Sequence, residues 1–335
     1  MGFLHKNFIT LCLLACLFAC GTAKKALPDP GYGSEGKEMP ESQVLGLNPE
    51  PEANLGATMA YLSSNALMGR EAGTEGIEKA ATFIEETLEA GGVKPFFGTY
   101  RDTLDNFKEI AFNIVGIVEG TDPDLKNEYI IVGAHYDHIG VRRGQGTDSI
   151  ANGANDNASG TATALEIARY FGRKHTNGRS LIFAFFSAEE EGLLGSQHLA
   201  KRLREQGLPL YLMLNFEMTG VPMKDKDYLM YVTGFDKSNL AEVCNGYAGE
   251  NVIGYLPTAA GYGLFERSDN YPFHQQFNVP SQTFCTFDFT NFDQYHKVGD
   301  ELQLMDLDHM ATLVDKMLPV IEAISNAPTA EISYY

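Results

Sequence analysis

Three short apolar segments, separated by segments with helical periodicity, constrain the fold more than any other feature of this sequence. The apolar segments cover residues 129–135, 180–188 and 210–216, and nearly every position in them suits a strand that is buried on both faces. The helical segments cover residues 159–174 and 193–207. Buried strands that alternate with amphipathic helices predict an α/β fold, with a central mixed, largely parallel β-sheet flanked by helices on both faces.

Further segments extend this pattern toward both ends of the chain. A helix is expected just before Gly91, with one buried face formed by Ile77, Ala81, Ile84 and Leu88. Residues 112–120 are typical of a strand, and residues 306–324 of a long closing helix. Residues 325–335 carry no clear pattern. A chain of 335 residues could hold two domains, but no internal repeat is visible and we expect a single domain over residues 52–335.

The N-terminal segment is expected to direct export. Residues 1–19 combine the basic Lys6 with an apolar stretch too short to span a bilayer, which is typical of a signal peptide. The letters LFAC that end at Cys20 resemble the lipobox of bacterial lipoproteins, which predicts a lipid anchor at Cys20 and a place in the bacterial cell envelope, on the periplasmic or surface side. A similar pattern at Cys16, or an ordinary cleaved signal, are the alternatives. Residues 20–51 are rich in Pro, Gly and Glu and are interpreted as a flexible tether.

Charge and cysteine content limit the partners and the covalent links. The chain has 44 Asp and Glu residues against 25 Lys and Arg residues, a net charge of -19, so nucleic acid and anionic membrane surfaces would be repelled. Membrane contact is therefore expected through the lipid anchor only. Beyond the N-terminal segment, Cys244 and Cys285 could form a disulfide or remain buried thiols, and their spacing does not decide between the two.

Carboxylates and imidazole follow the three apolar strands. His135 ends the first strand, Glu189 to Glu191 follow the second, Glu217 follows the third, and Asp156 precedes a helix. In open α/β sheets, sites form beyond the carboxyl ends of the strands. Each residue alone has an ordinary structural explanation, such as a helix N-cap or a hydrogen-bonded histidine. Together, carboxylates at one sheet edge would repel one another unless a cation lies among them, and these side chains are the ligands that zinc accepts.

Six motifs in this order make the chain similar to the metallopeptidase family 28, whose aminopeptidases hold two co-catalytic zinc ions. The motifs are AHYDHIG, NGANDNASGTA, SAEEEGLLGS, NFEMTG, RSDNYPF and YHKVGDE. The resemblance extends over residues 54–326 and implies the zinc-exopeptidase, phosphorylase/hydrolase-like fold. The interval over residues 93–129 is too short for the protease-associated domain that larger members insert, so the chain resembles the compact form.

The resemblance also implies a role for each residue of the motifs. Asp156 would bridge two zinc ions; the remaining ligands would be Glu190 and His296 at one site, and His135 and Glu217 at the other. The family more often has Asp at the position of Glu217, so the second zinc ion is expected to bind less tightly or to be replaced by another metal.

Further residues would support the reaction. Glu189 would act as the general base, and Asp137 would orient His135. Tyr295 would stabilise the oxyanion or, alternatively, form an aromatic wall of the pocket. His138 is expected to make a structural hydrogen bond, and Glu191 to face solvent.

The resemblance implies a zinc-dependent aminopeptidase that acts on peptides with a free N-terminus. The alternatives are a glutaminyl cyclase-like acyltransferase, which the intact EEEGLLGS block disfavours, and a non-catalytic peptide-binding relative, which would be expected to lack ligands. Arg267 and Asp269 are placed near the pocket without a role. The phenylalanine-rich residues 284–295 could line an apolar pocket or belong to the core. The side-chain preference, and the choice among aminopeptidase, carboxypeptidase and dipeptidase, are left open.

Overall fold

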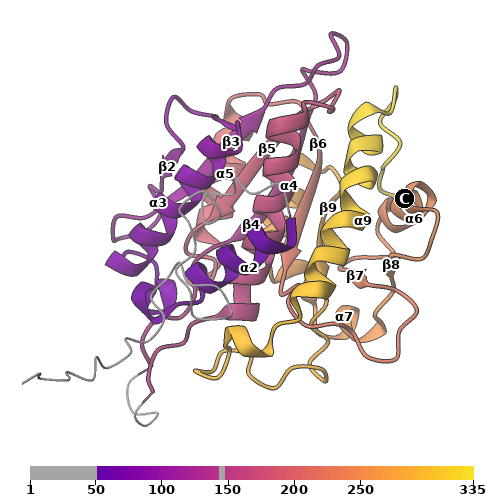
Figure 1. The fold of residues 1–335 in the computed structure, drawn as a ribbon. Coiled ribbons are helices and arrows are strands. Elements are labelled where there is room, and N and C mark those ends of the chain that lie inside the picture. Colours follow the sequence, from indigo (N-terminus) through magenta and orange to yellow (C-terminus); the bar gives the residue numbers. More distant parts are fainter. Residues whose placement is uncertain (1–50, 143–147) are drawn as a thin grey trace, which may run out of the picture.

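The computed structural model describes residues 51–142 and 148–335 of the chain (Figure 1). The predicted signal peptide, the lipid anchor at Cys20 and most of the predicted tether lie outside the described residues. Within the described part, no helix has both the length and the apolar character needed to cross a membrane.

A mixed β-sheet runs through the centre of the molecule (Figure 1). In the described residues it has nine strands in the order β1-β3-β5-β4-β6-β9-β7-β8, with β2 also pairing with β3. The strands β5, β4, β6 and β9 run parallel, and antiparallel pairs flank them on both sides. The predicted mixed, largely parallel sheet is therefore confirmed. The strands are β1 (Lys94–Pro95), β2 (Arg101–Thr103), β3 (Phe112–Val118), β4 (Tyr129–His135), β5 (Ser180–Phe186), β6 (Leu210–Glu217), β7 (Met230–Val232), β8 (Ile253–Gly254) and β9 (Ser281–Cys285).

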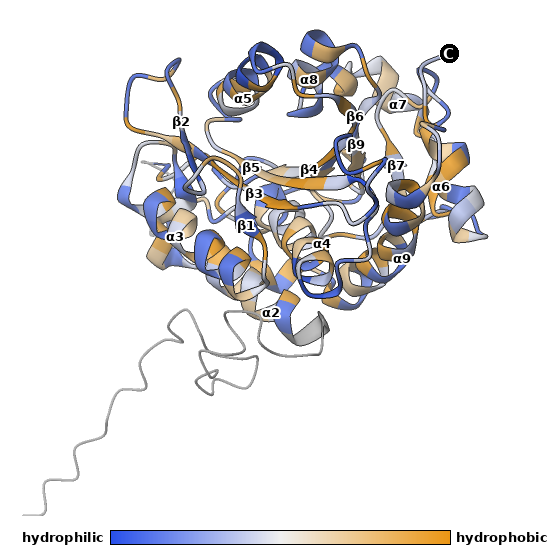
Figure 2. Ribbon diagram, turned by 90° about the horizontal axis from the view of Figure 1, so that it is seen from above, coloured by the Kyte–Doolittle hydropathy of each residue, from blue (hydrophilic) through white to orange (hydrophobic). Residues whose placement is uncertain are grey.

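Helices cover both faces of the sheet, as the alternating pattern predicted. Figure 2 shows α2, α3, α4 and α9 on one face, and α5 and α8 on the other. The helices are α2 (Pro51–Leu62), α3 (Glu75–Ala90), α4 (Gly160–Lys174), α5 (Leu194–Glu205), α6 (Leu240–Ala248), α7 (Pro257–Gly261), α8 (Asn270–Phe277) and α9 (Leu307–Asn326). Short helical turns cover Asn65–Arg70, Ala154–Ser159, Leu264–Glu266 and Leu302–Leu304.

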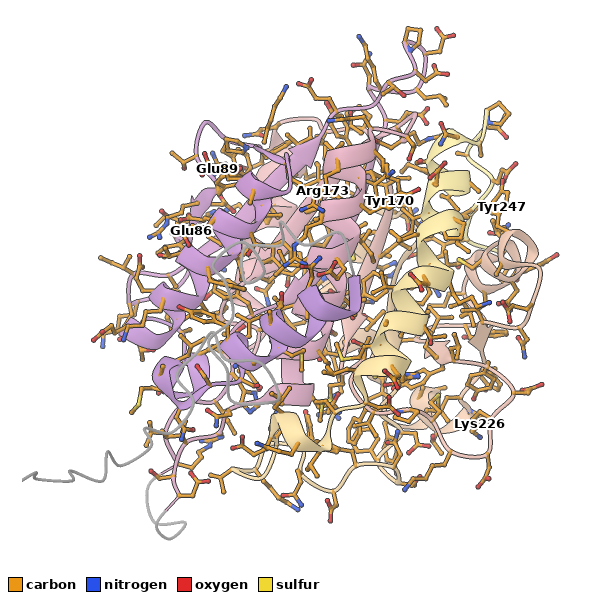
Figure 3. All side chains as sticks on the ribbon, viewed as in Figure 1. Glu86, Glu89, Tyr170, Arg173, Lys226 and Tyr247 are labelled. Atoms are coloured by element: carbon orange, nitrogen blue, oxygen red, sulfur yellow. The ribbon has the colours of Figure 1, made fainter. Side chains whose placement is uncertain are left out.

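The two faces of the sheet bury separate apolar clusters. Ile130 of β4 packs in the same cluster as Leu165 of α4, whereas its neighbour Ile131 packs with Leu199 of α5. Successive side chains of a strand point to opposite faces, so a strand covered on both sides needs an apolar residue at every position. This requirement explains the continuous apolar runs in the sequence. Charged residues such as Glu86 and Glu89 of α3 lie instead on exposed helix surfaces (Figure 3).

The structure resolves several points that the sequence left open. All four apolar residues predicted for the buried face of α3 are buried, and Gly91 caps that helix. Cys244 and Cys285 are both buried free thiols, so they do not form a disulfide. The tail beyond α9, which showed no pattern, packs against the domain: Tyr334 forms a bridge with Ser238, and its hydroxyl lies 2.7 Å from His274 Nδ1.

Candidate metal centre

The parallel strands bring the predicted site residues to one edge of the sheet. His135 is the last residue of β4 and pairs with Phe186, the last residue of β5, while Glu217 ends β6. A cavity of about 450 Å³ lies at this edge. Six of the residues that line it are predicted to bind metal or move protons: His135, Asp156, Glu189, Glu190, Glu217 and His296.

The first cluster of ligand atoms surrounds the Nε2 atom of His135. This atom lies 3.4 Å from Asp156 Oδ1 and 3.2 Å from Glu217 Oε1. The other ring nitrogen, Nδ1, lies 3.2 Å from the carbonyl oxygen of Asp137, which can only accept a hydrogen bond. If Nδ1 carries the proton of the neutral ring, Nε2 directs a lone pair toward two carboxylate oxygens. A cation would satisfy these three acceptors together.

The second cluster uses the other oxygen of Asp156. His296 Nε2 lies 3.2 Å from Asp156 Oδ2 and 3.1 Å from Glu190 Oε2. Despite this proximity, Asp156 Oδ2 is buried and forms no hydrogen bond with any described residue. A nitrogen and an oxygen that face each other without a hydrogen bond are the arrangement expected of two ligands of one ion. Asp156 is thus shared by both clusters, one oxygen to each.

Burial and mutual repulsion shape the charges of the site. Burial, reinforced by the charges of Asp269 and of two neighbouring glutamates, raises the pKa of Glu189 well above its ordinary value. Burial also raises the pKa of Glu217. The pKa of Asp156 is lowered, because its contacts with histidines outweigh the effect of burial. Carboxylates that gather in a buried site with imidazole fit divalent zinc, and the donor atoms of His135, Asp156 and Glu217 all lie within 4.8 Å of one another.

Asp137 connects the His135 strand to the loop that carries the glutamates. Its Oδ1 lies 3.5 Å from His135 Nδ1, whereas the hydrogen-bond partner of that nitrogen is the Asp137 backbone carbonyl oxygen. The two carboxylate oxygens also accept hydrogen bonds from the backbone N–H groups of Glu189 (3.2 Å) and Glu190 (3.3 Å). Asp137 therefore fixes the segment after β5 as well as the histidine. The next residue, Glu191, is exposed, as predicted.

Two residues that sequence reasoning missed hold the loop around Asp156. Asp300 accepts hydrogen bonds from the backbone N–H groups of Asn155 (2.7 Å) and Asp156 (3.0 Å). Arg70, which is fully buried, donates to the carbonyl oxygens of Asn152 (2.6 Å) and Gly153 (3.0 Å). Asp300 belongs to the quoted motif YHKVGDE, which could have drawn attention to it, whereas nothing in the sequence around Arg70 indicates its role.

Glu217 is held by a buried polar chain that leads to β6. Its Oε2 accepts a hydrogen bond from Ser268 Oγ at 2.8 Å, and Asn215 Nδ2 donates to that same Oγ at 2.9 Å. Arg267, the residue before Ser268, lines the cavity and is exposed. Asp269, the residue after Ser268, is buried. The structure thus places Arg267 at the cavity, and assigns neither Arg267 nor Asp269 a metal contact.

Aromatic rings form a continuous wall from the metal centre to the rim of the cavity. Tyr295 stacks on His296 with ring centroids 3.9 Å apart, and Phe287 stacks on Tyr295 at 5.2 Å. Phe289 continues the series to the exposed Tyr262, 4.8 Å away. The phenylalanine-rich segment therefore serves both expected roles: Phe284 and Phe292 are core residues, and Phe287, Phe289 and Tyr295 line the cavity. Burial raises the pKa of the Tyr295 hydroxyl.

Comparisons with known proteins agree with the architecture of this centre. Residues 113–321 match the profile of peptidase family M28. A probable leucine aminopeptidase of Trichophyton verrucosum is 29% identical over 249 residues, which cover 70% of this chain and 61% of the relative. Leucine aminopeptidase 1 of Ajellomyces capsulatus is 31% identical over 208 residues, 57% of this chain and 51% of the relative. The chain thus spans little more than half the length of these curated relatives.

Solved structures with the same fold include peptidases and a cyclase. The LapA aminopeptidase of Legionella pneumophila is similar with a TM-score of 0.63 and 24% identity, covering 84% of this chain and 74% of that one. The zinc aminopeptidase BSAP of Bacillus subtilis is similar with a TM-score of 0.51 and 25% identity, covering 67% of this chain and 52% of that one. The glutaminyl cyclase of Porphyromonas gingivalis is similar with a TM-score of 0.61 and 17% identity, covering 81% of this chain and 96% of that one. The fold alone therefore does not separate a peptidase from a cyclase.

Proposed function

Because the chain belongs to peptidase family M28, we propose that it is a zinc-dependent aminopeptidase that hydrolyses N-terminal residues from peptides. The observation that carries the proposal is the position of Asp156, whose two oxygens each face a separate cluster of ligand atoms. Two cation sites that share one carboxylate are typical of two-metal hydrolytic centres. The leucine aminopeptidases among the relatives support the same activity.

The proposed zinc ligands follow from the two clusters. His135, Asp156 and Glu217 would hold one ion, and Asp156, Glu190 and His296 the other. When bound, zinc lowers the pKa of water and polarises a carbonyl group. The family more often has Asp at the position of Glu217, which has the longer side chain. The hydrogen bond that Glu217 accepts from Ser268 holds its carboxylate in position.

The chain's own residues would move the protons and bind the substrate. Glu189 lines the cavity beside both clusters without being part of either. It would take a proton from the water that attacks the scissile carbonyl carbon and pass it to the nitrogen of the leaving amine. Tyr295, beside His296, would donate a hydrogen bond to the carbonyl oxygen as negative charge develops on it.

The cavity also suggests which N-terminal residue is preferred. One part of the cavity wall is built from apolar and aromatic side chains: Met218, Leu264, Phe287, Phe289 and Tyr295. Burial of an apolar side chain against this wall contributes about 25 cal/mol per Å² of apolar area. We therefore expect peptides that begin with leucine, methionine or phenylalanine to be hydrolysed faster than those that begin with aspartate.

A substrate panel tests the proposed function. The zinc-loaded protein should hydrolyse leucyl anilide but not N-acetyl-leucyl anilide, and it should lose this activity when zinc is removed by a chelator. Release from the blocked anilide at a comparable rate would contradict the aminopeptidase. Cyclisation of glutaminyl peptides without hydrolysis of leucyl anilide would identify a cyclase instead, and zinc binding without turnover of either would identify a binding protein.

The location of the protein is a separate part of the proposal. The lipobox-like sequence before Cys20 supports an exported lipoprotein, anchored in the bacterial cell envelope through acyl chains on that cysteine. Replacing Cys20 with Ser should release the protein from the membrane fraction. Unchanged processing and membrane association of the Cys20→Ser protein would contradict the lipid anchor.

A further inference from the structure

We propose that His138 is a positioning residue for the metal centre: it donates a hydrogen bond from Nδ1 to one oxygen of Glu190, and so holds the other oxygen toward the ligand atoms of Asp156 and His296. This inference rests on the zinc sites of the proposed function. It concerns a residue that lies outside the proposed ligand set.

The two carboxylate oxygens of Glu190 face different histidines. Oε1 lies 2.9 Å from His138 Nδ1, and Oε2 lies 3.1 Å from His296 Nε2. His296 Nε2 is also 3.2 Å from Asp156 Oδ2, whereas His138 Nδ1 is 3.8 Å from that oxygen. His296 Nε2 thus lies close to Glu190 Oε2 and Asp156 Oδ2, whereas His138 contacts the other oxygen of Glu190. Donor atoms of His138, Asp156 and Glu190 also lie within 4.8 Å of one another, so the experiment has to separate a positioning role of His138 from a direct metal contact.

Packing fixes the imidazole of His138 in this position. Its side chain is fully buried, and its backbone N–H donates to the carbonyl oxygen of Arg70 at 3.2 Å. The ring lies against Gly153, where a Cβ atom would approach it to 2.5 Å. Its other neighbour is the ring of His296, in an edge-on contact with centroids 5.9 Å apart. A ring enclosed in this way presents a donor to Glu190 at a defined place.

The second ring nitrogen indicates which one carries the proton. His138 Nε2 is buried and has no hydrogen-bond partner among the described residues. A proton on Nε2 would be buried without an acceptor, which costs more than leaving a lone pair there, because the donor loses its hydrogen bond to water. A neutral ring with its proton on Nδ1 avoids this cost and supplies the donor that the Glu190 carboxylate accepts.

A hydrogen bond that orients a metal ligand contributes to metal affinity without touching the metal. Loss of such a partner typically weakens metal binding by about 10–100-fold. We therefore expect this loss in His138→Leu at one of the two zinc sites. His138→Asn should retain zinc affinity to within about threefold, because its amide nitrogen is as far along the side chain as Nδ1 and can donate in its place.

The experiment measures zinc affinity at both sites by competition with a chromogenic chelator, using protein stripped of metal and zinc alone as the probe. A third variant is His138→Gln, whose amide reaches the position of Nε2 and is polar but places no donor at Nδ1. It should bind zinc as weakly as His138→Leu. If the leucine variant does not fold, His138→Gln provides the test. The exposed His175 provides the control, and His175→Gln should bind zinc like the parent.

Two results would overturn the inference. Parental zinc affinity in both His138→Leu and His138→Gln would show that the hydrogen bond has no effect on the metal. An equal loss in His138→Asn and His138→Gln would show that the imidazole itself is required, as for a direct ligand. A parent protein that binds two zinc ions but hydrolyses no peptide would contradict the proposed function and leave these comparisons intact.

Discussion

Replacement of Arg70 by Met should destabilise the whole protein, because the buried guanidinium joins three segments of the chain. It donates to the carbonyl oxygens of Leu62, Tyr136, Asn152 and Gly153, and the last three lie in the loops beside the metal centre. Burial lowers the pKa of Arg70 to about 10, so the group remains charged at neutral pH and makes charge-assisted bonds.

The structure gives the size of this effect. A methionine of similar length fills the space but leaves the carbonyl oxygens of Leu62, Tyr136 and Asn152 unpaired, at about 1 kcal/mol or more for each, whereas that of Gly153 still accepts from the backbone N–H of Ala158. The expected loss is therefore about 3 kcal/mol, which at about 2 °C per kcal/mol for a large domain corresponds to a fall of about 6 °C in Tm.

The assay is thermal unfolding of the chelator-treated protein, so that zinc binding does not mask the change. The matched control is Arg204→Met, because the Arg204 side chain is exposed and lies over the ring of Phe277, 5.9 Å from its centroid, in a cation–π interaction. This control should shift Tm by no more than about 2 °C, since surface substitutions rarely cost more than about 0.5–1 kcal/mol. Equal shifts in both variants would refute the role assigned to Arg70.

Three further predictions concern pH, backbone geometry and metal. Hydrogen bonds to Asp102 and Asp105 raise the pKa of His198. The stability that protonated His198 contributes should therefore be complete below about pH 6.5 and decline as the pH rises through the raised pKa. A stability difference between the parent and His198→Gln that stays constant from about pH 5.5 to about pH 9 would contradict this. Gly153→Ala should lower Tm by several degrees, because φ is +58° and a Cβ would lie 2.2 Å from the carbonyl oxygen of Asp156; calorimetry that finds an unchanged Tm would show that the loop adapts. Zinc at 100 times its dissociation constant should stabilise the chelator-treated protein by about 2.7 kcal/mol and so raise its Tm, and the rise should be smaller in Glu217→Gln. Equal rises in Tm would argue against Glu217 as a ligand.

Local patterns were sufficient to predict four of the nine described strands, β3, β4, β5 and β6, together with several residues of the metal centre. The strands β4, β5 and β6 could be predicted because burial on both faces leaves a continuous apolar signature. His135 and Glu217 could be placed at one edge because parallel strands share a direction. The specific ligand set depended further on the resemblance to a known family.

The supporting contacts could not be predicted in this way, because they join residues far apart in the chain. Arg70 lies 83 positions from Gly153, and Asp300 lies 144 positions from Asp156. The packing of the tail is another example, since the backbone N–H of Ile332 donates to the hydroxyl of Tyr211, 121 positions away. Periodicity reports which face of an element is buried, but not which distant polar group completes a hydrogen bond.

The distinction between the neighbouring glutamates tests the proposed mechanism most directly. Zinc content and turnover of leucyl anilide should be measured for Glu189→Gln and Glu190→Gln, with the exposed Glu191→Gln as the control. If Glu189 moves a proton and Glu190 binds zinc, Glu189→Gln should keep both zinc ions and lose turnover by about 10²–10⁴-fold. Glu190→Gln should bind one zinc ion weakly, because an amide is a poorer ligand than a carboxylate, and Glu191→Gln should match the parent. Loss of zinc in Glu189→Gln together with its retention in Glu190→Gln would contradict the mechanism.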